Sequence, residues 1–393
     1  MKRIIIIALL FNCQLSTVNC QLSIGNVLQT IENNNKELQA DIQLIQSQKL
    51  EDKAENNLQD PSVSYVRQYG NRGELGIQGE LVASQSFDFP TLYGQRNKLS
   101  KTKAESYDWQ HADLRQQVLL NAKEICLDLI RLNQQKKLLD ERLDNAERLS
   151  GLYARRLETG DANILETNKI NLELLNVRTE ARRNEADIVQ KQKELAALNG
   201  GIPLDFTQTA YEHQELPLLN DLYAETLTRN PQLLALRSDQ AVAKQSVSVN
   251  KSQWLPELEV GYRLNTAAGG ERFNGFIVGM SIPLFSNKHQ VKKAKAASLY
   301  SELKYDDASG KIENELFQLY NQSVTLKESM DEYSRLLKEQ NNISLLNKAL
   351  EAGQISMIEY FVEVSSLYDS MTNFMQIEND YQKAVAQLLK HRL

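Results

Sequence analysis

Apolar residues recur at spacings of three, four and seven positions along two long stretches of the chain. In the first half this spacing predicts a helix over about 92–158 and a partner helix over about 162–198. The spacing is typical of coiled-coil seams, and a helix over 92–158 would be roughly 100 Å long, more than an ordinary globular domain needs. The seam positions of the longer helix are Val118, Ala122, Ile125, Leu129, Leu132, Leu139, Leu143, Ala146, Tyr153 and Leu157. Those of its partner are Leu174, Ala181, Ile188 and Leu195, and the second half repeats the pattern at Leu316, Leu319, Leu326, Met330, Tyr333 and Leu337.

Four shorter segments alternate apolar and polar residues with a period of two, which predicts strands at about 61–70, 74–89, 256–265 and 274–284. In the second strand one face carries Leu75, Ile77, Gly79, Leu81, Ala83, Phe87 and Phe89, and the other carries Glu74, Gln78, Glu80, Ser84, Ser86 and Asp88. The apolar faces of the last two strands are Leu258, Val260, Tyr262 and Leu264, followed by Phe276, Val278, Met280, Ile282 and Leu284.

The same alternation would suit a soluble sheet packed on a core. No further segment of the chain is available to cover the apolar faces, however, and strands of about 10–15 residues are long enough to cross a bilayer when tilted. Four strands cannot close a membrane barrel, and unpaired edges are not tolerated in lipid. If the strands enter a membrane, several chains must therefore contribute strands to one barrel.

The chain is predicted to be a tandem duplication. Residues 35–40, NKELQA, correspond to residues 230–235, NPQLLA, and each pair of strands closes at a proline, Pro90 or Pro283. Leu157-Glu158-Thr159-Gly160 corresponds to Leu350-Glu351-Ala352-Gly353, and these landmarks share an offset of 193 to 195 residues. We therefore expect repeats over 21–205 and 206–393, each with the order helix, strand, strand, long helix, turn, helix. The turns form hairpin tips at about 155–163 and 348–356.

The first twenty residues have the pattern of a secretory signal peptide. Lys2 and Arg3 precede the apolar run Ile4–Phe11, and Val18-Asn19-Cys20 offers a small-residue cleavage site. A run of eight apolar residues is too short to span a bilayer as a helix, which argues against a retained anchor. Lipidation of Cys20 is the remaining alternative. No later stretch of the chain resembles a transmembrane helix.

Composition excludes several classes of function. Without Lys2 and Arg3, 43 basic residues stand against 51 acidic ones, which argues against a general nucleic-acid binder. The four histidines are scattered without ligand spacing, and no catalytic, phosphate-binding or metal-binding motif is present, so we expect no enzyme activity, cofactor or metal. Cys126, the one cysteine left after cleavage, lies on a helical pattern and is expected to be a small buried hydrophobic residue.

The chain resembles the TolC family of outer-membrane ducts in three features, which also occur in the same order and spacing. These are the duplicated strand pairs, the segments FDFP and SIPLF that close them, and the LExG helix tips. The resemblance covers nearly the whole chain beyond the signal peptide. It implies a mainly helical homotrimer with a twelve-stranded transmembrane β-barrel in outer-membrane lipid, four strands coming from each chain. Below the barrel, an α-helical barrel would extend into the periplasm of a Gram-negative bacterium. A periplasmic adaptor (membrane fusion protein) and an inner-membrane efflux pump, such as one of the RND type, would dock at its far end.

The resemblance also implies candidate site residues. The adaptor-docking tips correspond to Arg155, Arg156, Leu157, Gly160 and Asp161 in the first repeat and to Lys348, Leu350, Gly353 and Gln354 in the second. An acidic pore constriction corresponds to Glu359, with Val362 at the position of the family's second carboxylate and Glu363 one position further on. The alternative is that Glu359 is an ordinary surface residue. Glycine is also the usual residue at a helix C-terminus, so both roles apply to the tip glycines.

Two other classes of protein fit the sequence less well than the duct does. A soluble periplasmic adaptor would also contain long antiparallel helices, but in one hairpin flanked by β domains, and the duplication argues against it. A secreted hydrolase would need a catalytic constellation that the sequence lacks. Drug, metal-cation and protein exporters share these signatures, although the short chain resembles the compact metal-efflux ducts somewhat more. The lysines at 288, 292, 293 and 295 are expected at the meeting point of barrel and helices, either as a solvated collar or facing anionic groups at the membrane.

Overall fold

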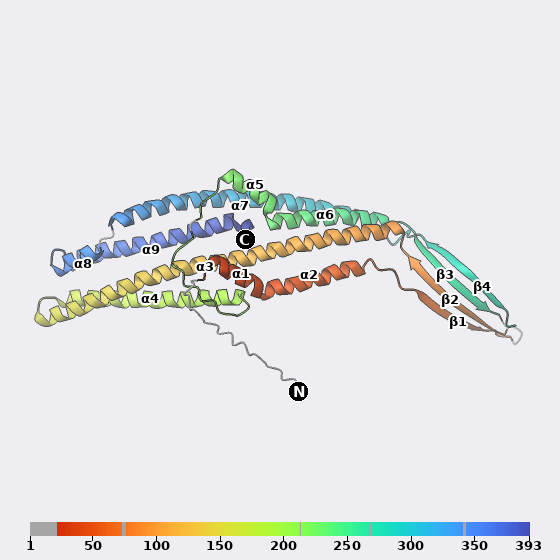
Figure 1. Ribbon diagram of the computed structural model, residues 1–393, viewed down its shortest axis with the longest axis horizontal. Coiled ribbons are helices and arrows are strands. Elements are labelled where there is room, and N and C mark those ends of the chain that lie inside the picture. Colours follow the sequence, from red (N-terminus) through yellow and green to blue (C-terminus); the bar gives the residue numbers. More distant parts are fainter. Residues whose placement is uncertain (1–21, 73–75, 213, 268, 341–342) are drawn as a thin grey trace, which may run out of the picture.

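The computed structural model describes residues 22–393 except 73–75, 213, 268 and 341–342, so the predicted signal peptide and Cys20 lie outside the described residues. The chain forms a long rod of helices with a sheet at one end (Figure 1). The first half contains α1 (Ile24–Asn34), α2 (Lys36–Ala54), β1 (Ser62–Tyr69), β2 (Ile77–Phe87), α3 (Pro90–Thr159) and α4 (Ile164–Leu198). The second contains α5 (Leu219–Arg229), α6 (Pro231–Ser252), β3 (Glu257–Thr266), β4 (Arg272–Ser281), α7 (Gln290–Gln340), α8 (Ile343–Glu351), α9 (Met357–Leu388) and the 3-10 helix η2 (Lys390–Arg392). The predicted fold class, mainly helical with a small antiparallel β part, is confirmed.

The repeated Asn motif marks a corner between two helices in each half. Asn35 ends α1 and caps α2, because its side chain accepts a hydrogen bond from the amide of Leu38 at 3.0 Å. Asn230 does the same between α5 and α6, accepting from the amide of Leu233 at 3.3 Å. An Asn side chain at this position satisfies an amide that has no partner within the helix. The motif therefore predicts the bend between α1 and α2, and the matching bend between α5 and α6.

The four strands form one antiparallel sheet in the order β1-β2-β3-β4, in which β2 and β3 join the two halves of the chain. In this register Tyr65 lies opposite Leu81, Leu81 opposite Leu264, and Tyr262 opposite Phe276. All four apolar faces consequently lie on one side of the sheet. On the other side, Arg263 and Glu80 form an ion pair at 2.9 Å.

The sheet has two unpaired edges, and prolines mark the end of the sheet that adjoins the helices. Among the described residues, β1 pairs only with β2 and β4 only with β3. β4 ends at Ser281, before the expected limit at 284, because Pro283 cannot donate a backbone hydrogen bond to a strand partner. Proline has the opposite role at Pro90, where it occupies the first turn of α3 and its fixed φ favours the helix.

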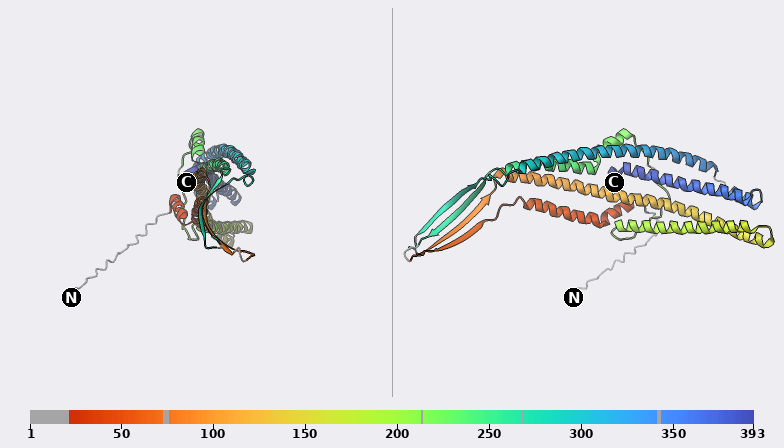
Figure 2. Two further views of the ribbon diagram at one scale, coloured as in Figure 1. Left: turned by 90° about the vertical axis from the view of Figure 1, so that its right-hand side faces the viewer. Right: turned by 180° about the vertical axis from the view of Figure 1, so that it is seen from behind.

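The helices run side by side along the rod, with α3 and α4 in one hairpin and α7, α8 and α9 in the other (Figure 2). The central core lies where α1, α3, α4 and the link between the repeats meet, and includes Val27, Leu129, Leu195 and Phe206. Cys126 is fully buried in this core, and burial raises the pKa of its thiol to about 12. It therefore packs as a small hydrophobic residue, as its place in the helical pattern predicted.

The link between the repeats lies against α3 as an extended strap. The side-chain amides of Asn133 and Gln134 donate to the backbone carbonyls of Gln208 and Thr209, at 3.0 and 3.1 Å. Side-chain donors thus replace the backbone partners that a segment outside helix or sheet otherwise lacks. The strap carries the chain from the end of α4 to the start of α5 without leaving the surface of the rod.

A half-buried carboxylate ties the two hairpins together beside this strap. Asp128 of α3 contacts Lys383 of α9 at 2.6 Å and Lys191 of α4 at 3.4 Å, and accepts a hydrogen bond from Asn379 at 3.1 Å. The hydroxyl of Tyr211, on the strap, donates to Asn379 at 3.2 Å. Burial alone would raise the pKa of Asp128, but the bonds from Lys383 and Asn379 outweigh it and lower the pKa below its usual 3.8.

We predict that Asp128→Asn destabilises the chain by about 2 kcal/mol, because it removes the carboxylate that pairs with Lys383 and leaves Lys191 with Glu194 alone. Asp307→Asn, which removes an exposed i,i+4 pair with Lys311, should cost about 0.5 kcal/mol or less. Denaturant unfolding followed by circular dichroism measures both. The contribution of the Asp128 charge is present above pH 3.8 and is lost as the pH falls through its lowered pKa. The difference between the native chain and Asp128→Asn should therefore narrow in acid, and equal losses for the two variants at neutral pH would contradict this assignment.

Candidate docking tips and pore-lining ridge

The helical end of the rod carries two tips with the same construction. In the first tip Gly160 caps the C-terminus of α3 with a left-handed φ of 82°, and the amide of Asp161 donates to the carbonyl of Arg156 at 2.8 Å. Asn163 then caps α4, and Glu166 completes a capping box by accepting from the backbone amide of Asn163 at 3.1 Å.

The second tip repeats each of these steps. Gly353 has a φ of 69°, and the amide of Gln354 donates to the carbonyl of Ala349 at 2.8 Å. Ser356 accepts from the amide of Glu359 at 3.2 Å, and the carboxylate of Glu359 accepts from the amide of Ser356 at 2.7 Å. The duplication therefore extends to the caps that fix the direction of each hairpin turn.

Most of the predicted docking residues lie on the surface of these tips. Leu350 does not: it is only 2% exposed and packs with Met357 and Tyr360. Leu350 thus supports the second tip from within, and its place in the predicted docking surface is corrected accordingly. Arg156 and Leu157 are half-buried, and the exposed residues are Arg155, Gly160, Asp161, Lys348, Gly353 and Gln354.

The two tips are joined by contacts that the sequence did not reveal. The hydroxyl of Tyr360 accepts a hydrogen bond from Asn145 of α3 and donates one to Asn347 of α8, each at 2.7 Å. Arg148 of α3 forms an ion pair with Glu351. Tyr360 is almost completely buried, and burial raises the pKa of its hydroxyl, so it remains a neutral donor at physiological pH.

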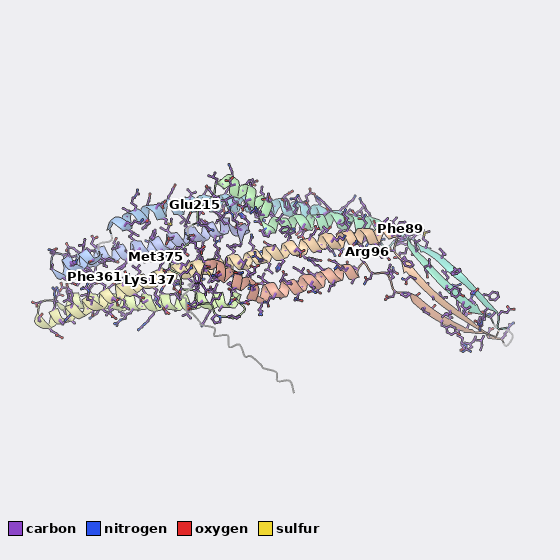
Figure 3. All side chains as sticks on the ribbon, viewed as in Figure 1. Phe89, Arg96, Lys137, Glu215, Phe361 and Met375 are labelled. Carbon is purple, nitrogen blue, oxygen red and sulfur yellow. The ribbon has the colours of Figure 1, made fainter. Side chains whose placement is uncertain are left out.

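Helix α9 forms a ridge between two grooves. One groove, of about 690 Å³, lies between α4 and α9, and the other, of about 430 Å³, lies between α9 and α7–α8. Ser366 and Ser370 border both grooves and so mark the crest of the ridge. Phe361 lies toward the tip end of α9 (Figure 3). Lys169 of α4 lies over its ring, 5.2 Å from the ring centre, at the larger groove. The further α9 residues that line this groove are mostly polar: Val362, Ser365, Asp369 and Asn373.

The predicted constriction residues lie at the tip end of this ridge. Glu359 is exposed, and Glu363, one helical turn further on, lines the smaller groove. Hydrogen bonds from Ser356 lower the pKa of Glu359, so its carboxylate is charged at neutral pH. Val362 is 61% exposed and lines the larger groove. Since Glu166 has the same capping role in the first repeat, capping alone accounts for a Glu at position 359. A role in a pore would be additional to it.

Within the described part of the chain, no three His, Cys, Asp or Glu side chains gather as they would around a metal ion. None of the described helices combines the length and the apolar character needed to cross a membrane.

Comparison with known proteins agrees with this architecture. Residues 222–391 match the family model described as outer membrane efflux protein. Alkaline protease secretion protein AprF of Pseudomonas aeruginosa is 25% identical over 239 residues, which make up 54% of this chain and 50% of AprF. The chain thus spans about half the length of the curated relative that it matches.

Solved structures extend the likeness to nearly the whole chain. The outer-membrane channel OprN matches with a TM-score of 0.79 and 13% identity, covering 94% of this chain and 89% of its own. CusC gives 0.76 and 16%, covering 94% and 91%. The outer membrane protein VceC of Vibrio cholerae gives 0.73 and 14%, covering 94% of each chain.

The fold is the one seen in these solved outer-membrane channels. Together with the family match over residues 222–391, it makes the chain similar to the outer membrane efflux proteins of the TolC type. The resemblance that the strand pairs and tips indicated is confirmed.

We predict that Tyr360→Phe loosens the contact between the tips. It removes one hydroxyl that serves two asparagines, at a cost of about 1–2 kcal/mol. Hydrogen exchange at the end of α8 and the start of α9 should rise, while exchange around α1 stays unchanged. Tyr368→Phe is the matched control, since among the described residues the Tyr368 hydroxyl has no hydrogen-bond partner although its ring is buried. An equal rise in exchange in both variants would contradict a specific role for the Tyr360 hydroxyl.

Proposed function

We propose that three copies of this chain form a passive exit duct in the outer membrane of a Gram-negative bacterium. The duct serves a tripartite efflux or type I secretion system. The observation that carries the proposal is the sheet: its apolar face is uncovered and both of its outer edges lack strand partners among the described residues. The long helices extend from this sheet toward the two tips (Figure 1).

The exposure of the sheet favours lipid on one face. Phe276 and Val278 are 89% and 86% exposed on the apolar face, where a soluble sheet would have a covering layer. Backbone groups on open edges are not tolerated in lipid, so β4 of one copy needs β1 of the next. Three copies supply twelve strands, a number that can close a membrane barrel.

The helices favour the same assembly. The two outermost long helices, α4 and α7, each carry a row of exposed apolar side chains in addition to those buried within the chain. On α4 the row comprises Leu165, Leu172, Leu175 and Val189, and on α7 it comprises Leu299, Leu303, Phe317, Val324 and Leu336. Rows at both sides of one copy suit a closed ring, in which α4 of one copy packs near α7 of the next.

The length and the tips support docking at the far end. Helix α3 has 70 residues, which corresponds to about 105 Å. Such a rod can place its tips deep in the periplasm, where a periplasmic adaptor and an inner-membrane pump would meet them. The duct itself carries no energy source, so the pump would supply the energy for transport.

The polar ridge of α9 supports a water-filled interior that narrows near the tips. Threefold symmetry would bring three copies of Glu359 around one axis, with Glu363 one turn further along the helix. Such a ring attracts cations, and repulsion among its members would raise carboxylate pKa values that hydrogen bonds lower within one chain.

Two experiments test whether strands from three chains form one barrel: the mass of the assembly and a pair of adjacent substitutions. Light scattering of the detergent-extracted chain, with detergent subtracted, should give the mass of three chains. Val278→Arg places a charge on the apolar face at a cost of about 2–4 kcal/mol near mid-membrane, and should reduce the trimer recovered from membranes. Ile277→Arg, at the same depth on the opposite face, should have a much smaller effect. A detergent-independent monomer would refute the duct.

The pore role of Glu359 is tested by single-channel recording. Glu359→Gln should weaken block by multivalent cations, because it removes three charges from the ring in one substitution. Glutamine retains the capping box, so the tip stays folded. Glu166→Gln changes the equivalent cap of the first repeat and should leave block unchanged. Unaltered block in Glu359→Gln would remove this residue from the constriction.

A further inference from the structure

Four segments of the chain join helix to strand where the sheet meets the helices. The one at the end of α2, residues 51–61, contains four acidic residues and one lysine, whereas the other three are basic without a single acidic residue. They are residues 89–104 at the start of α3, 240–256 at the end of α6, and 282–301 at the start of α7. Together they contain Arg96, Lys98, Lys101, Lys103, Lys244, Lys251, Lys288, Lys292, Lys293 and Lys295. The whole chain has a net charge of −6, so this end of the rod has the opposite sign to the whole chain.

Only a few of these charges are neutralised within the described part of the chain. Arg96 pairs with Asp88, and Lys103 pairs with Asp52. The other eight residues are exposed lysines, none of which forms an ion pair with a described carboxylate. We call these eight lysines the basic collar. Lys288 lies in the link between β4 and α7, and the other seven lie within about 20 Å, measured along the helix, of the helix end that joins the sheet.

Exposed apolar side chains lie between the collar and the strands. Phe285 is 83% exposed and Trp254 is 43% exposed, and both lie in the short links between helix and strand. Leu255, Ile282 and Leu284 are exposed in the same links. The rod therefore presents, in order, an apolar sheet face, an apolar and aromatic belt, and a ring of lysines. Lysine can bury its alkyl stem beside an apolar surface while its ammonium group contacts a polar headgroup.

We propose that the basic collar binds the phosphate groups of anionic phospholipids in the leaflet nearest the helices. This proposal rests on the proposed function, which places the sheet in the membrane. Unpaired ammonium groups repel one another when they are close, and anionic headgroups at the end of an apolar sheet face supply the missing counter-charge. The aromatic belt marks the depth at which the headgroups begin. The collar thus fixes how deep the barrel sits and selects anionic lipid around its base.

The experiment uses the full chain in proteoliposomes, with Trp109→Phe leaving Trp254 as the only tryptophan. Its fluorescence is recorded with phosphatidylcholine or phosphatidylglycerol that carries brominated acyl chains, since bromine quenches only nearby tryptophan. We expect quenching by both lipids, with a preference for phosphatidylglycerol of about fivefold for each lysine that faces the headgroups. The preference should fall as salt is raised.

Two triple variants separate the collar from general charge effects. Lys292→Gln with Lys293→Gln and Lys295→Gln should reduce the preference toward one. The control combines Lys193→Gln, Lys327→Gln and Lys338→Gln, exposed lysines that lie far from the sheet on α4 and α7, and should retain it. Circular dichroism confirms that each variant is folded.

The outcomes distinguish the two levels of the proposal. No quenching of Trp254 by either lipid would refute the membrane position of the sheet, and with it the proposed function. Equal quenching by both lipids would be consistent with the proposed duct but would contradict the binding of anionic phospholipid by the collar. A preference for phosphatidylglycerol as large in the collar variant as in the native chain would also overturn it. The proposal would also be overturned if carbodiimide cross-linked the collar lysines to carboxylates of a second copy and no lipid preference were found.

Discussion

The backbone groups along the outer edges of β1 and β4 need hydrogen-bond partners, and much of the architecture depends on this requirement. Within one chain both edge strands, β1 and β4, have backbone donors and acceptors without strand partners among the described residues. No other described element covers the apolar face of the sheet. A single copy is therefore an incomplete unit in water and in lipid alike. Helices α4 and α7 likewise carry exposed apolar rows, so the proposed trimer would cover apolar side chains in the helical part as well as in the sheet.

The elements were predictable because each has a local physical signal. The seven-residue spacing from Val118 to Leu157 indicated the long helix, and the alternation from Leu258 to Leu264 indicated an amphipathic strand. Contacts between distant segments were not predictable in this way. Asn145 and Tyr360 lie 215 positions apart, and nothing in either neighbourhood marks them as partners. The three contacts of Asp128 were equally hidden, because each participating residue alone resembles an ordinary polar residue on a helix.

The candidate site was predicted unevenly for a related reason. The glycines of the tips stand out because few other residues adopt a left-handed backbone, and this local requirement is visible in the sequence. The family resemblance of the LExG tip predicted Leu350, three positions before Gly353, on the docking surface, whereas the packing of the second tip buries it. Glu359 illustrates how a cap and a pore residue can share one position: Ser356 holds its carboxylate in place, and the side chain is still exposed on the ridge of α9.

The pairing of β2 with β3 also determines the order in which the molecule can fold. Paired residues in these strands are 171 to 187 positions apart, from Phe87 with Leu258 to Gly79 with Thr266. Each helical hairpin, by contrast, closes over a short turn and can form from contacts that are local in sequence. Because closing a long loop carries the larger entropic cost, the central ladder should form late, after both repeats are present and their hairpins have begun to pack. Until then the chain holds only two separate strand pairs, and the continuous apolar surface that could aggregate during transit to the membrane does not yet exist.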